Sequence, residues 1–567
     1  MTTAAPPAQS ARTPAYAWVV LAMLCFVYIF NFMDRQLMSV LAGDIKEDLK
    51  LTDTQVGLMT GLFFALFYTL LGVAAGWLAD RSVRVRILAA GCFIWSLFTL
   101  LCGRANSFPV MAVARMGVGV GEAAGAPPSY SIVSDYFPAE KRGLALALFS
   151  LGVPFGMALG TYVGPTIAKT FDDADGHGGW RMAFIIIGVA GMLASFLLLL
   201  IVREPKKGAT DVKLDVHMSE APAIHVPQPF SKSLNEFFGR PMLLVSAIAC
   251  AMAAFVGYAI LNWTVVFMQR EFGKEEWALM NTNYALMLAA SMGLGTALSG
   301  KVVDWLAKKS KVNYGLLPAA ALALGLPGFL GFVWAPTMIG KLAFLAIPTF
   351  FNIFYLAPAL AVVQNSVKAT QRTISGAMLL LVLNLIGLGG GPTMIGILSD
   401  HFNEGNLTAA SLTPELCKTA IDAAKAACGA ASADGLQHAL YFLTPFYVLA
   451  ILALLGMAYC IKKEVANGPP SEAAMARNAK VFKLLVGFGG IAIILVAEQF
   501  LTNHPPMGDL DAFTSLIQGN AFGTGAQHSG GITDAQVLNG LIRDLLMVLM
   551  AVVGLWGLGD VFKKKAA

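Results

Sequence analysis

Charged side chains are scarce in this chain. Asp, Glu, Lys and Arg make up 13% of its 567 residues, whereas apolar residues make up 57%. This composition excludes an ordinary water-soluble domain and indicates a protein that crosses a membrane many times. A glycine-rich phosphate loop with a lysine is also missing, which argues against a pump driven by ATP. The seven histidines show no metal-ligand spacing, so we expect no metal site and no cofactor.

Cysteine is used mostly as a small apolar residue. Five of the seven cysteines fall in apolar runs, and only Cys417 and Cys428 lie in a polar loop. A continuous helix would hold these two about 16 Å apart, so a disulfide between them requires a break in the helix. The sequence leaves open whether the bridge forms.

Fourteen apolar runs are long enough to cross a membrane, since one crossing needs about 20 residues. An even number of crossings places both termini on one side. If that side is the cytoplasm, the inner segments hold 26 of the 39 Lys and Arg residues and the outer loops hold 10, as the positive-inside rule requires. The positive charge therefore follows the loops, so we expect no nucleic-acid partner. The runs are 15–42, 54–78, 86–105, 108–136, 143–169, 180–202, 241–268, 277–300, 314–335, 337–366, 373–399, 438–461, 481–502 and 540–562.

Two segments six crossings apart share one pattern. GWLADRSVRVR, at the inner end of run 54–78, and GKVVDWLAKKS, at the inner end of run 277–300, both contain Gly-x-x-x-Asp followed by cations. Such a duplication predicts two six-helix bundles related by a pseudo-two-fold axis. The expected parts are an N-terminal bundle over 15–202, a cytoplasmic linker over 203–240, a C-terminal bundle over 241–462 and two additional transmembrane helices within 481–562.

This repeat resembles the major facilitator superfamily of secondary transporters, whose signature in the same loop is Gly-x-x-x-Asp-Arg-x-Gly-Arg-Arg/Lys. Val83 replaces the second glycine, and Val85 replaces a cation that is displaced to Arg86. The resemblance implies that Asp80 latches the cytoplasmic gate by pairing with cations, Arg142 or Arg372, and with a helix N-terminus of the other half. Alternatively, these charges only fix the topology. The expected gating residues are Gly76, Asp80, Arg81, Arg84, Arg142 and Asp304.

Four charged residues lie inside apolar runs. Asp34 and Arg35 occur in NFMDRQ of the first run, and Arg115 and Glu122 occur in RMGVGVGEAAGAPPSY of the fourth. Facing lipid, the four would together cost roughly 10 to 14 kcal/mol, at about 2.5 to 3.5 kcal/mol each. We therefore expect them to face one another or water.

Helix geometry predicts how these charges meet. Arg115 and Glu122 share one helix face about 10 Å apart, and Gly119 between them leaves room for a small cavity. The first and fourth runs cross in opposite directions, which puts Asp34 and Arg115 at similar depth. We infer an Asp34–Arg115 ion pair, with Glu122 as a second carboxylate nearer the cytoplasm.

Proline and glycine predict how these helices bend and pack. Pro127 and Pro128 remove two backbone donors, so the fourth run should kink or unwind close to Glu122. Glycines recur every four residues in the fifth run, from Gly152 to Gly164. This spacing predicts a smooth ridge on which another helix packs.

The charges suggest a way to couple a solute to protons. A carboxylate deprived of water holds a proton more tightly, and a nearby guanidinium opposes this. Removal of the arginine would therefore let the acid take up a proton near neutral pH. One charge crossing the membrane carries about 2.3 kcal/mol per 100 mV, which could drive accumulation of another solute. The alternative is a clamp between two helices with no role in transport.

NFMDR, RMGVGVGEA and SDYFPAEKRGLALALFSLG resemble the Spinster-like branch of the same superfamily, most closely over residues 25–165. The best-known animal members export sphingosine-1-phosphate or lysophospholipids. The resemblance implies a transporter of an amphipathic anion whose head group is bound by Arg35 or Arg115. The expected protein is monomeric and exchanges substrate and protons within a bacterial inner membrane, which the Ala- and Gly-rich composition favours.

Other interpretations stay open at this point. A sugar, organic-anion or drug exchanger of the same fold fits the same pattern, and so does a membrane receptor or scaffold that never cycles. Isolated polar residues of the second half either line the cavity or only bond across helices. They are Asn262, Asn352, Tyr355, Gln364 and Asn384.

One motif points to catalysis instead. NHPPMGD at 503–509 has the Asn-His-x4-Asp spacing of glycerolipid acyltransferases, in which the aspartate orients the histidine as general base. Those enzymes need an α/β domain around the motif, whereas here it lies in a loop of about 37 residues between two apolar runs. We therefore expect no enzyme activity.

Overall fold

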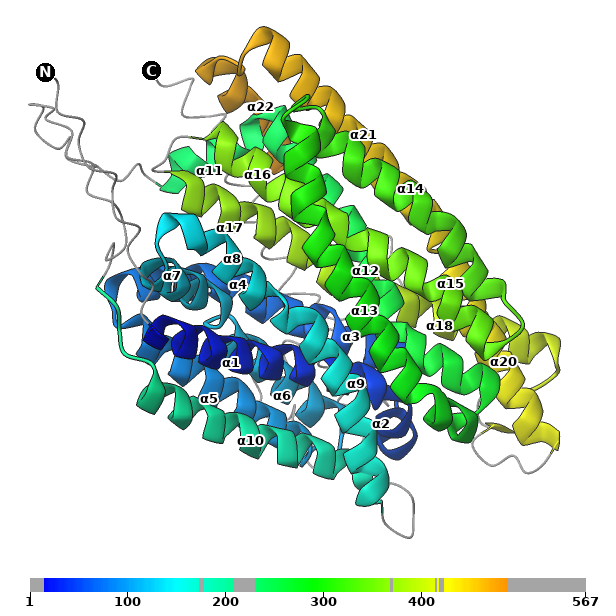
Figure 1. Ribbon diagram of the computed structural model, residues 1–567. Helices are drawn as coiled ribbons and strands as arrows, with labels where there is room; N and C mark the ends of the chain where they lie inside the picture. The colour runs from blue at the N-terminus through cyan, green and yellow to red at the C-terminus, as the bar shows by residue number, and fades with distance from the viewer. Residues whose placement is uncertain are drawn as a thin grey trace, which may run out of the picture.

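A computed structural model describes residues 15–172, 178–206, 230–367, 371–413, 416–417, 423–484 and 486. These described residues form helices joined by short turns, and Figure 1 shows the helices gathered in two bundles. Among the described residues, 11 helical segments are long and apolar enough to cross a membrane. The expected all-α membrane fold is therefore confirmed.

The first bundle lies within residues 15–206, and several of its crossings consist of two helices with a break between them. Its helices are α1 (Ala15–Val40), α2 (Ala42–Leu49), α3 (Asp53–Thr60), α4 (Leu62–Arg81), α5 (Arg84–Cys102), α6 (Phe108–Glu122), α7 (Ala126–Tyr136), α8 (Ala139–Ser150), α9 (Gly152–Thr170) and α10 (Gly179–Ile201).

The second bundle follows the expected linker. Its helices are α12 (Pro241–Phe272), α13 (Lys274–Ala307), α14 (Asn313–Trp334), α15 (Met338–Phe351), the 3-10 helix η1 (Asn352–Tyr355), α16 (Leu356–Ser366), α17 (Arg372–Val382), the π-helix η3 (Leu383–Leu388), α18 (Gly389–Ala409), α20 (Ala423–Tyr441) and α21 (Thr444–Asn467). The last two expected runs, except for residues 481–484 and 486, and the motif at 503–509 lie outside the described residues.

The two ends of the bundles are named here by their turns. The basic end carries the turns at residues 82–83, 137–138 and 308–312, and the far end carries those at 103–107 and 335–337. In Figure 1 the basic end lies at the upper left and the far end at the lower right. Both bundles run between these ends.

Glycines allow α9 to lie directly on α1. A Cβ atom at Gly156 would be 2.6 Å from the carbonyl oxygen of Ile29, and one at Gly160 would be 2.7 Å from that of Met33. Real Cβ atoms do not approach this closely, so only glycine permits the contact. The expected glycine ridge therefore packs against α1, the helix that carries Asp34 and Arg35.

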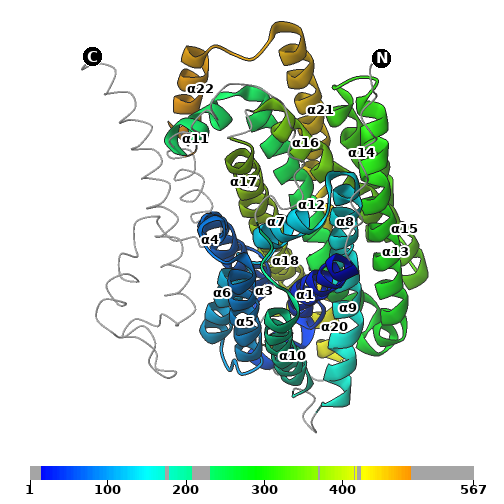
Figure 2. The same ribbon diagram turned by 60° about the vertical axis from the view of Figure 1, so that its left-hand side comes forward.

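Two short helices pack together at the basic end of the second bundle, α11 (Phe230–Gly239) and α22 (Glu472–Leu484). Figure 2 shows them side by side. The Phe238 and Phe482 rings stack with centroids 4.6 Å apart, and Asn478 Nδ2 donates to the Gly239 carbonyl at 3.1 Å. Arg240, directly after α11, is bonded to Glu464 of α21. The last part of the expected linker is thus a helix fixed to the second bundle.

Cys417 and Cys428 form a disulfide, with their Cα atoms 5.8 Å apart. Cys428 lies in α20, whereas Cys417 precedes the start of that helix at Ala423. A Cα separation of 5.8 Å is far below the about 16 Å of a continuous helix, so the two cysteines do not lie on one unbroken helix.

Candidate functional site

The fourth crossing is interrupted at its middle. Helix α6 ends at Glu122, and α7 begins at Ala126 with Pro127 and Pro128 in its first turn. Proline suits the first turn of a helix because the N–H groups there have no intrahelical acceptor. Gly125 N donates to the Glu122 carbonyl at 2.9 Å and closes the turn between the helices. The expected interruption is present, and it leaves Glu122 at a helix end inside the bundle.

Asp34 and Arg115 are buried beside each other. Arg115 Nη1 lies 3.8 Å from Asp34 Oδ1, and the two side chains are 2% and 3% exposed. Thr99 of α5 donates to the other carboxylate oxygen, Oδ2. Asp34 Oδ1 and two guanidinium nitrogens of Arg115 have no hydrogen-bond partner among the described residues. The structure thus brings the inferred pair together without a direct hydrogen bond.

Arg35 forms a second ion pair, with Glu122. Its Nε donates to Glu122 Oε2 at 2.5 Å, and the Glu122 side chain is fully buried. The guanidinium carbon lies 4.9 Å from the ring centroids of both Phe32 and Phe64 and 4.5 Å from that of Tyr68. Aromatic faces at these distances attract a cation. The pairing of Arg35 with Glu122 was not predicted, nor were the aromatic residues around Arg35.

The prediction of a small cavity beside Gly119 is wrong. A Cβ atom at Gly119 would be 2.7 Å from the carbonyl oxygen of Phe64, so the backbone of α4 fills this space. The close approach also places the Phe64 ring 5.5 Å from the Arg115 guanidinium as well as near Arg35. One aromatic ring therefore lies next to both arginines.

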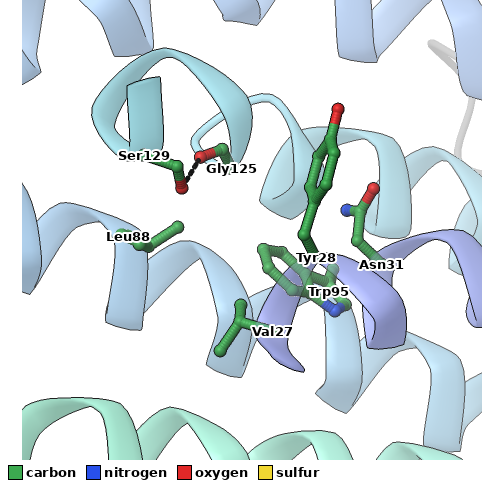
Figure 3. Close-up of a pocket in the computed structure, with 7 residues that line it drawn as sticks. All are labelled: Val27, Tyr28, Asn31, Leu88, Trp95, Gly125 and Ser129. Carbon is green, nitrogen blue, oxygen red and sulfur yellow. Dashed lines mark hydrogen bonds between the residues drawn. The ribbon is translucent and has the colours of Figure 1, made fainter. Parts of the chain in front are cut away.

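A narrow recess lies beside the break in the fourth crossing (Figure 3). Ser129 Oγ donates to the Gly125 carbonyl at 2.7 Å on one side of it, and Asn31 lies on the other. The recess lies on the basic-end side of Asp34, because Asn31 precedes it in α1. Its lining residues are Val27, Tyr28, Asn31, Leu88, Trp95, Gly125 and Ser129.

Two of the expected polar residues of the second half bond to neighbouring helices. Asn262 Oδ1 accepts a hydrogen bond from Ser39 Oγ at 2.6 Å, which joins the two bundles. Asn352, with its amide oriented as its neighbours require, donates to the Ala253 carbonyl and accepts from Gly257 N. Of the others, Tyr355 ends η1, Asn384 lies in η3 and Gln364 lies in α16.

The expected gating residues lie at the basic end. Arg84 pairs with Asp135 at 2.5 Å and with Glu204 at 2.7 Å, so these contacts stay within the first bundle. Arg142 Nε lies 3.5 Å from the Phe137 carbonyl, which it donates to. Gly76 and Arg81 lie in α4. The side chains of Asp80, Asp304 and Arg372 lie outside the described residues.

An ion-pair cluster that the sequence analysis missed joins the bundles at the far end. Both terminal nitrogens of Arg270 donate to the Asp53 carboxylate, at 2.7 and 2.5 Å, and Ser399 donates to it at 2.6 Å. Lys46 also pairs with Asp53, at 2.5 Å. Burial lowers the pKa of the Lys46 ammonium, and the Arg270 charge lowers it further, while Asp53 opposes both effects. Asp53 is thus held by cations from both bundles.

Asp400 of α18 binds the N-terminus of α3 in the other bundle. Its carboxylate accepts from the backbone N–H groups of Asp53 at 3.0 Å and Thr54 at 2.7 Å. Gly396 lies one turn earlier, where a Cβ atom would be 2.3 Å from the Asp53 carbonyl oxygen. A carboxylate at a helix N-terminus is favoured by the helix dipole. We call Asp53, Arg270, Gly396 and Asp400 the far-end latch.

One sequence signal could have located the far-end latch. Gly396 and Asp400 have the same Gly-x-x-x-Asp spacing as the segments beginning at Gly76 and Gly300, but they lie at the opposite end of the molecule. No signal marks Thr99, which lies in the apolar stretch LFTLL of α5.

Comparisons with known proteins identify the family of the chain. The profile of the Major Facilitator Superfamily matches residues 24–392. The chain is 29% identical over 400 residues to an MFS-type efflux pump of Mycolicibacterium smegmatis, which covers 69% of this chain and 86% of the relative. It is 26% identical to Protein spinster homolog 1 of Homo sapiens, which covers 69% of this chain and 74% of the relative.

A solved structure is similar over most of the chain. It is the crystal structure of a bacterial homolog of the human lysosomal transporter Spinster in an inward-facing and unoccupied conformation. The TM-score is 0.69 and the sequence identity is 28%, with 81% of this chain and 99% of the other covered.

Proposed function

The chain belongs to the Major Facilitator Superfamily and is Spinster-like, and from this membership we propose that it transports an amphipathic anion coupled to protons. The proposed substrate class is a lysophospholipid or a sphingosine-1-phosphate-like lipid. We infer that it moves by alternating access between the two bundles. Membrane transport is the activity of the family, whereas the substrate and the coupling ion are our proposal.

One observation carries the proposal. Two carboxylates and two arginines are buried together in the first bundle, as the pairs Arg35–Glu122 and Arg115–Asp34. Each carboxylate has one oxygen without a hydrogen-bond partner among the described residues. Buried ionisable groups in a membrane bundle are costly and mark ion and substrate pathways. A cluster that only held helices together would gain from satisfying these atoms.

Charge balance explains how a proton and an anion would move together. The four groups carry two positive and two negative charges, so the ionised cluster is neutral. An anionic head group that binds an arginine displaces its carboxylate, and a carboxylate left alone in a dry site takes up a proton. Binding of one negative charge and one proton keeps the cluster neutral. The site therefore favours occupation by both together.

The far-end latch supports alternating access. Asp53–Arg270 and the capping of α3 by Asp400 join the bundles at one end of the molecule. The similar solved structure has an inward-facing conformation. We propose that the basic end faces the cytoplasm, as the excess of Lys and Arg in its loops favours. We also propose that both termini lie there, that the membrane is a bacterial inner membrane, and that the protein acts as a monomer without enzyme activity.

Reconstituted transport tests the proposal. The full chain is inserted into liposomes, a pH gradient is imposed, and movement of a fluorescent lysophospholipid across the bilayer is followed. Asp34→Asn and Glu122→Gln should each abolish the dependence on the gradient, because an amide does not bind the transported proton. Asp48→Asn is the matched control, since Asp48 pairs with Arg181 at 2.6 Å within the first bundle, away from the cluster. Gradient-driven transport that is unchanged in Asp34→Asn and Glu122→Gln would overturn the proposal.

The similarity to the mycobacterial efflux pump favours a second candidate, drug efflux. The same liposomes distinguish the two candidates when they are loaded with the cationic dye ethidium. Gradient-driven movement of the dye without movement of the lysophospholipid would favour drug efflux. The proposed function predicts movement of the lysophospholipid, which carries the negative charge that Arg35 and Arg115 can bind.

A further inference from the structure

Thr99 has two acceptors for a single hydroxyl proton. Its Oγ1 lies within hydrogen-bond distance of Asp34 Oδ2 and also 2.9 Å from the Trp95 carbonyl oxygen one turn earlier in α5. A threonine hydroxyl donates one hydrogen bond and accepts up to two. Thr99 is 1% exposed, so bulk water does not reach its hydroxyl. The hydroxyl therefore donates to one of these oxygens at a time.

We propose that Thr99 is a positioning residue that keeps Asp34 hydrogen-bonded in both its ionised and its protonated form. With Asp34 ionised, the Thr99 hydroxyl donates to Oδ2. With Oδ2 protonated, the acid donates to Thr99 Oγ1, and the threonine proton turns to the Trp95 carbonyl. The transported proton stays on Asp34 in this exchange, and no heavy atom has to move. The inference rests on the proposed function, in which Asp34 changes its protonation state.

The surroundings of Asp34 leave this role to Thr99. Arg115 Nη1 lies 3.8 Å from Asp34 Oδ1, beyond hydrogen-bond distance, and its Nε and Nη1 have no hydrogen-bond partner among the described residues. A guanidinium also cannot accept a bond from a protonated acid, whereas a hydroxyl can. Thr99 is therefore suited to both forms of the acid.

The other ionisable groups near Asp34 come from three elements. Arg35 lies on α1 itself, Arg115 and Glu122 lie on α6, and the thiols of Cys92 and Cys102 lie on α5. Tyr162 and Lys169 of α9 are exposed, and Arg181 of α10 pairs with Asp48. Among the residues that the structure describes, Thr99 is the one that donates a hydrogen bond to the Asp34 carboxylate.

Replacing Thr99 changes the proton equilibrium in a defined direction. Thr99→Val keeps the shape but removes the hydroxyl. The ionised form of Asp34 loses more stabilisation than the protonated form, because hydrogen bonds to a charged group are about twice as strong as neutral ones. Protonation of Asp34 should therefore shift to higher pH by about 0.5 to 1 unit. Thr99→Ser keeps the hydroxyl that bonds to Asp34, so its Asp34 midpoint should match that of the wild type.

Infrared spectroscopy of the full chain in lipid measures this shift directly. The carboxylic acid C=O band is titrated with pH, and the part that disappears in Asp34→Asn is assigned to Asp34. The matched control is Thr60→Val, since Thr60 is buried and its hydroxyl bonds to the backbone carbonyls of Val56 and Gly57. It should leave the Asp34 midpoint unchanged. If Thr99→Val fails to fold, Thr99→Ala carries the same expectation.

The outcomes separate the inference from the proposed function. A shift in Thr99→Val that Thr99→Ser restores supports the inference. An Asp34 band that titrates with the same midpoint in Thr99→Val and in the wild type overturns the role of Thr99 and leaves proton coupling at Asp34 standing. An Asp34 band that does not titrate at all overturns the proton role of Asp34, and the inference with it.

Discussion

Arg35 Nε lies 2.5 Å from Glu122 Oε2, so the first crossing is bonded to the broken end of the fourth. Glu122 is the last residue of α6, and three residues separate it from the start of α7 at Ala126. Protonation of Glu122 would remove the charge that holds Arg35 there. A change in charge at this pair is therefore also a change in the contact between two helices that carry the site.

Replacing Arg35 by lysine should slow transport by at least about tenfold. Lysine keeps the charge, but it loses the planar group that lies over Phe32, Phe64 and Tyr68, and each such contact stabilises by about 0.5 to 2 kcal/mol. The matched control is Arg181→Lys, because Arg181 lies 4.2 Å from the Trp180 ring at the far end, away from the site. Initial rates in liposomes measure both. Equal rates in Arg35→Lys and the wild type would contradict the aromatic contribution.

Replacing Gly396 by alanine should open the far-end latch. The added Cβ would be 2.3 Å from the Asp53 carbonyl oxygen, so α18 and α3 must separate, and Asp400 loses its two backbone donors. Hydrogen bonds to a charged group contribute about 1.5 to 3 kcal/mol each, enough to change which end is closed. The matched control is Gly405→Ala on the same helix, where a Cβ meets nothing within 4 Å.

Spin labels at the exposed residues Lys50 and Glu276 would measure the separation of the bundles at the far end. Cys25 and Cys460 are first replaced by serine, since both are free and partly accessible. Gly396→Ala should add a population at longer distance, whereas Gly405→Ala should match the parent. An unchanged distance distribution in Gly396→Ala would show that the latch does not hold the far end closed.

Replacing Gly160 by alanine should destabilise the first bundle. The new Cβ would be 2.7 Å from the Met33 carbonyl and 2.9 Å from Gln36 Cβ, and overpacking of this kind costs about 1 to 3 kcal/mol. The resulting shift of α1 would also displace Asp34 and Arg35. Thermal unfolding in detergent should show a lower midpoint than for Gly143→Ala, where a Cβ meets nothing within 4 Å. Equal midpoints would refute the packing role of the glycine ridge.

Removing the disulfide should lower stability but leave transport intact. Cys417 and Cys428 enclose a short loop at the far end, and such a bridge contributes about 2 to 4 kcal/mol. Cys417→Ser, Cys428→Ser and the double variant should all lower the free energy of unfolding by the same amount, because each breaks the same bond. Thermal unfolding measures this, with Cys460→Ser as a control at a free cysteine. Additive losses in the double variant would contradict a single shared bond.

The membrane crossings and the pairing of Asp34 with Arg115 could be predicted from the position of each residue along its helix. Length and polarity of the apolar runs predicted the crossings, and the depth of Asp34 and Arg115 predicted that they would be neighbours. The prolines after Glu122 predicted the break in the fourth crossing. These predictions depend on counting residues along a helix axis, which a sequence supports well.

The remaining contacts depend on how each helix is rotated about its own axis. The sequence does not indicate this rotation. A buried membrane helix is apolar on all sides, so its pattern does not say which face meets which neighbour. For this reason Arg35 was not assigned to Glu122, and the space beside Gly119 was expected to be empty although Phe64 fills it. The latch at Asp53 and Asp400 was missed because it joins residues more than 300 positions apart.

The stacking of Phe238 on Phe482 ties α22 to α11, and Arg240, directly after α11, is bonded to Glu464 of the second bundle. A fluorophore attached to an exposed position of α22 would then move together with the second bundle. Paired with a second dye on the first bundle, it would turn the rocking of single molecules into a light signal, even before any solute has been identified.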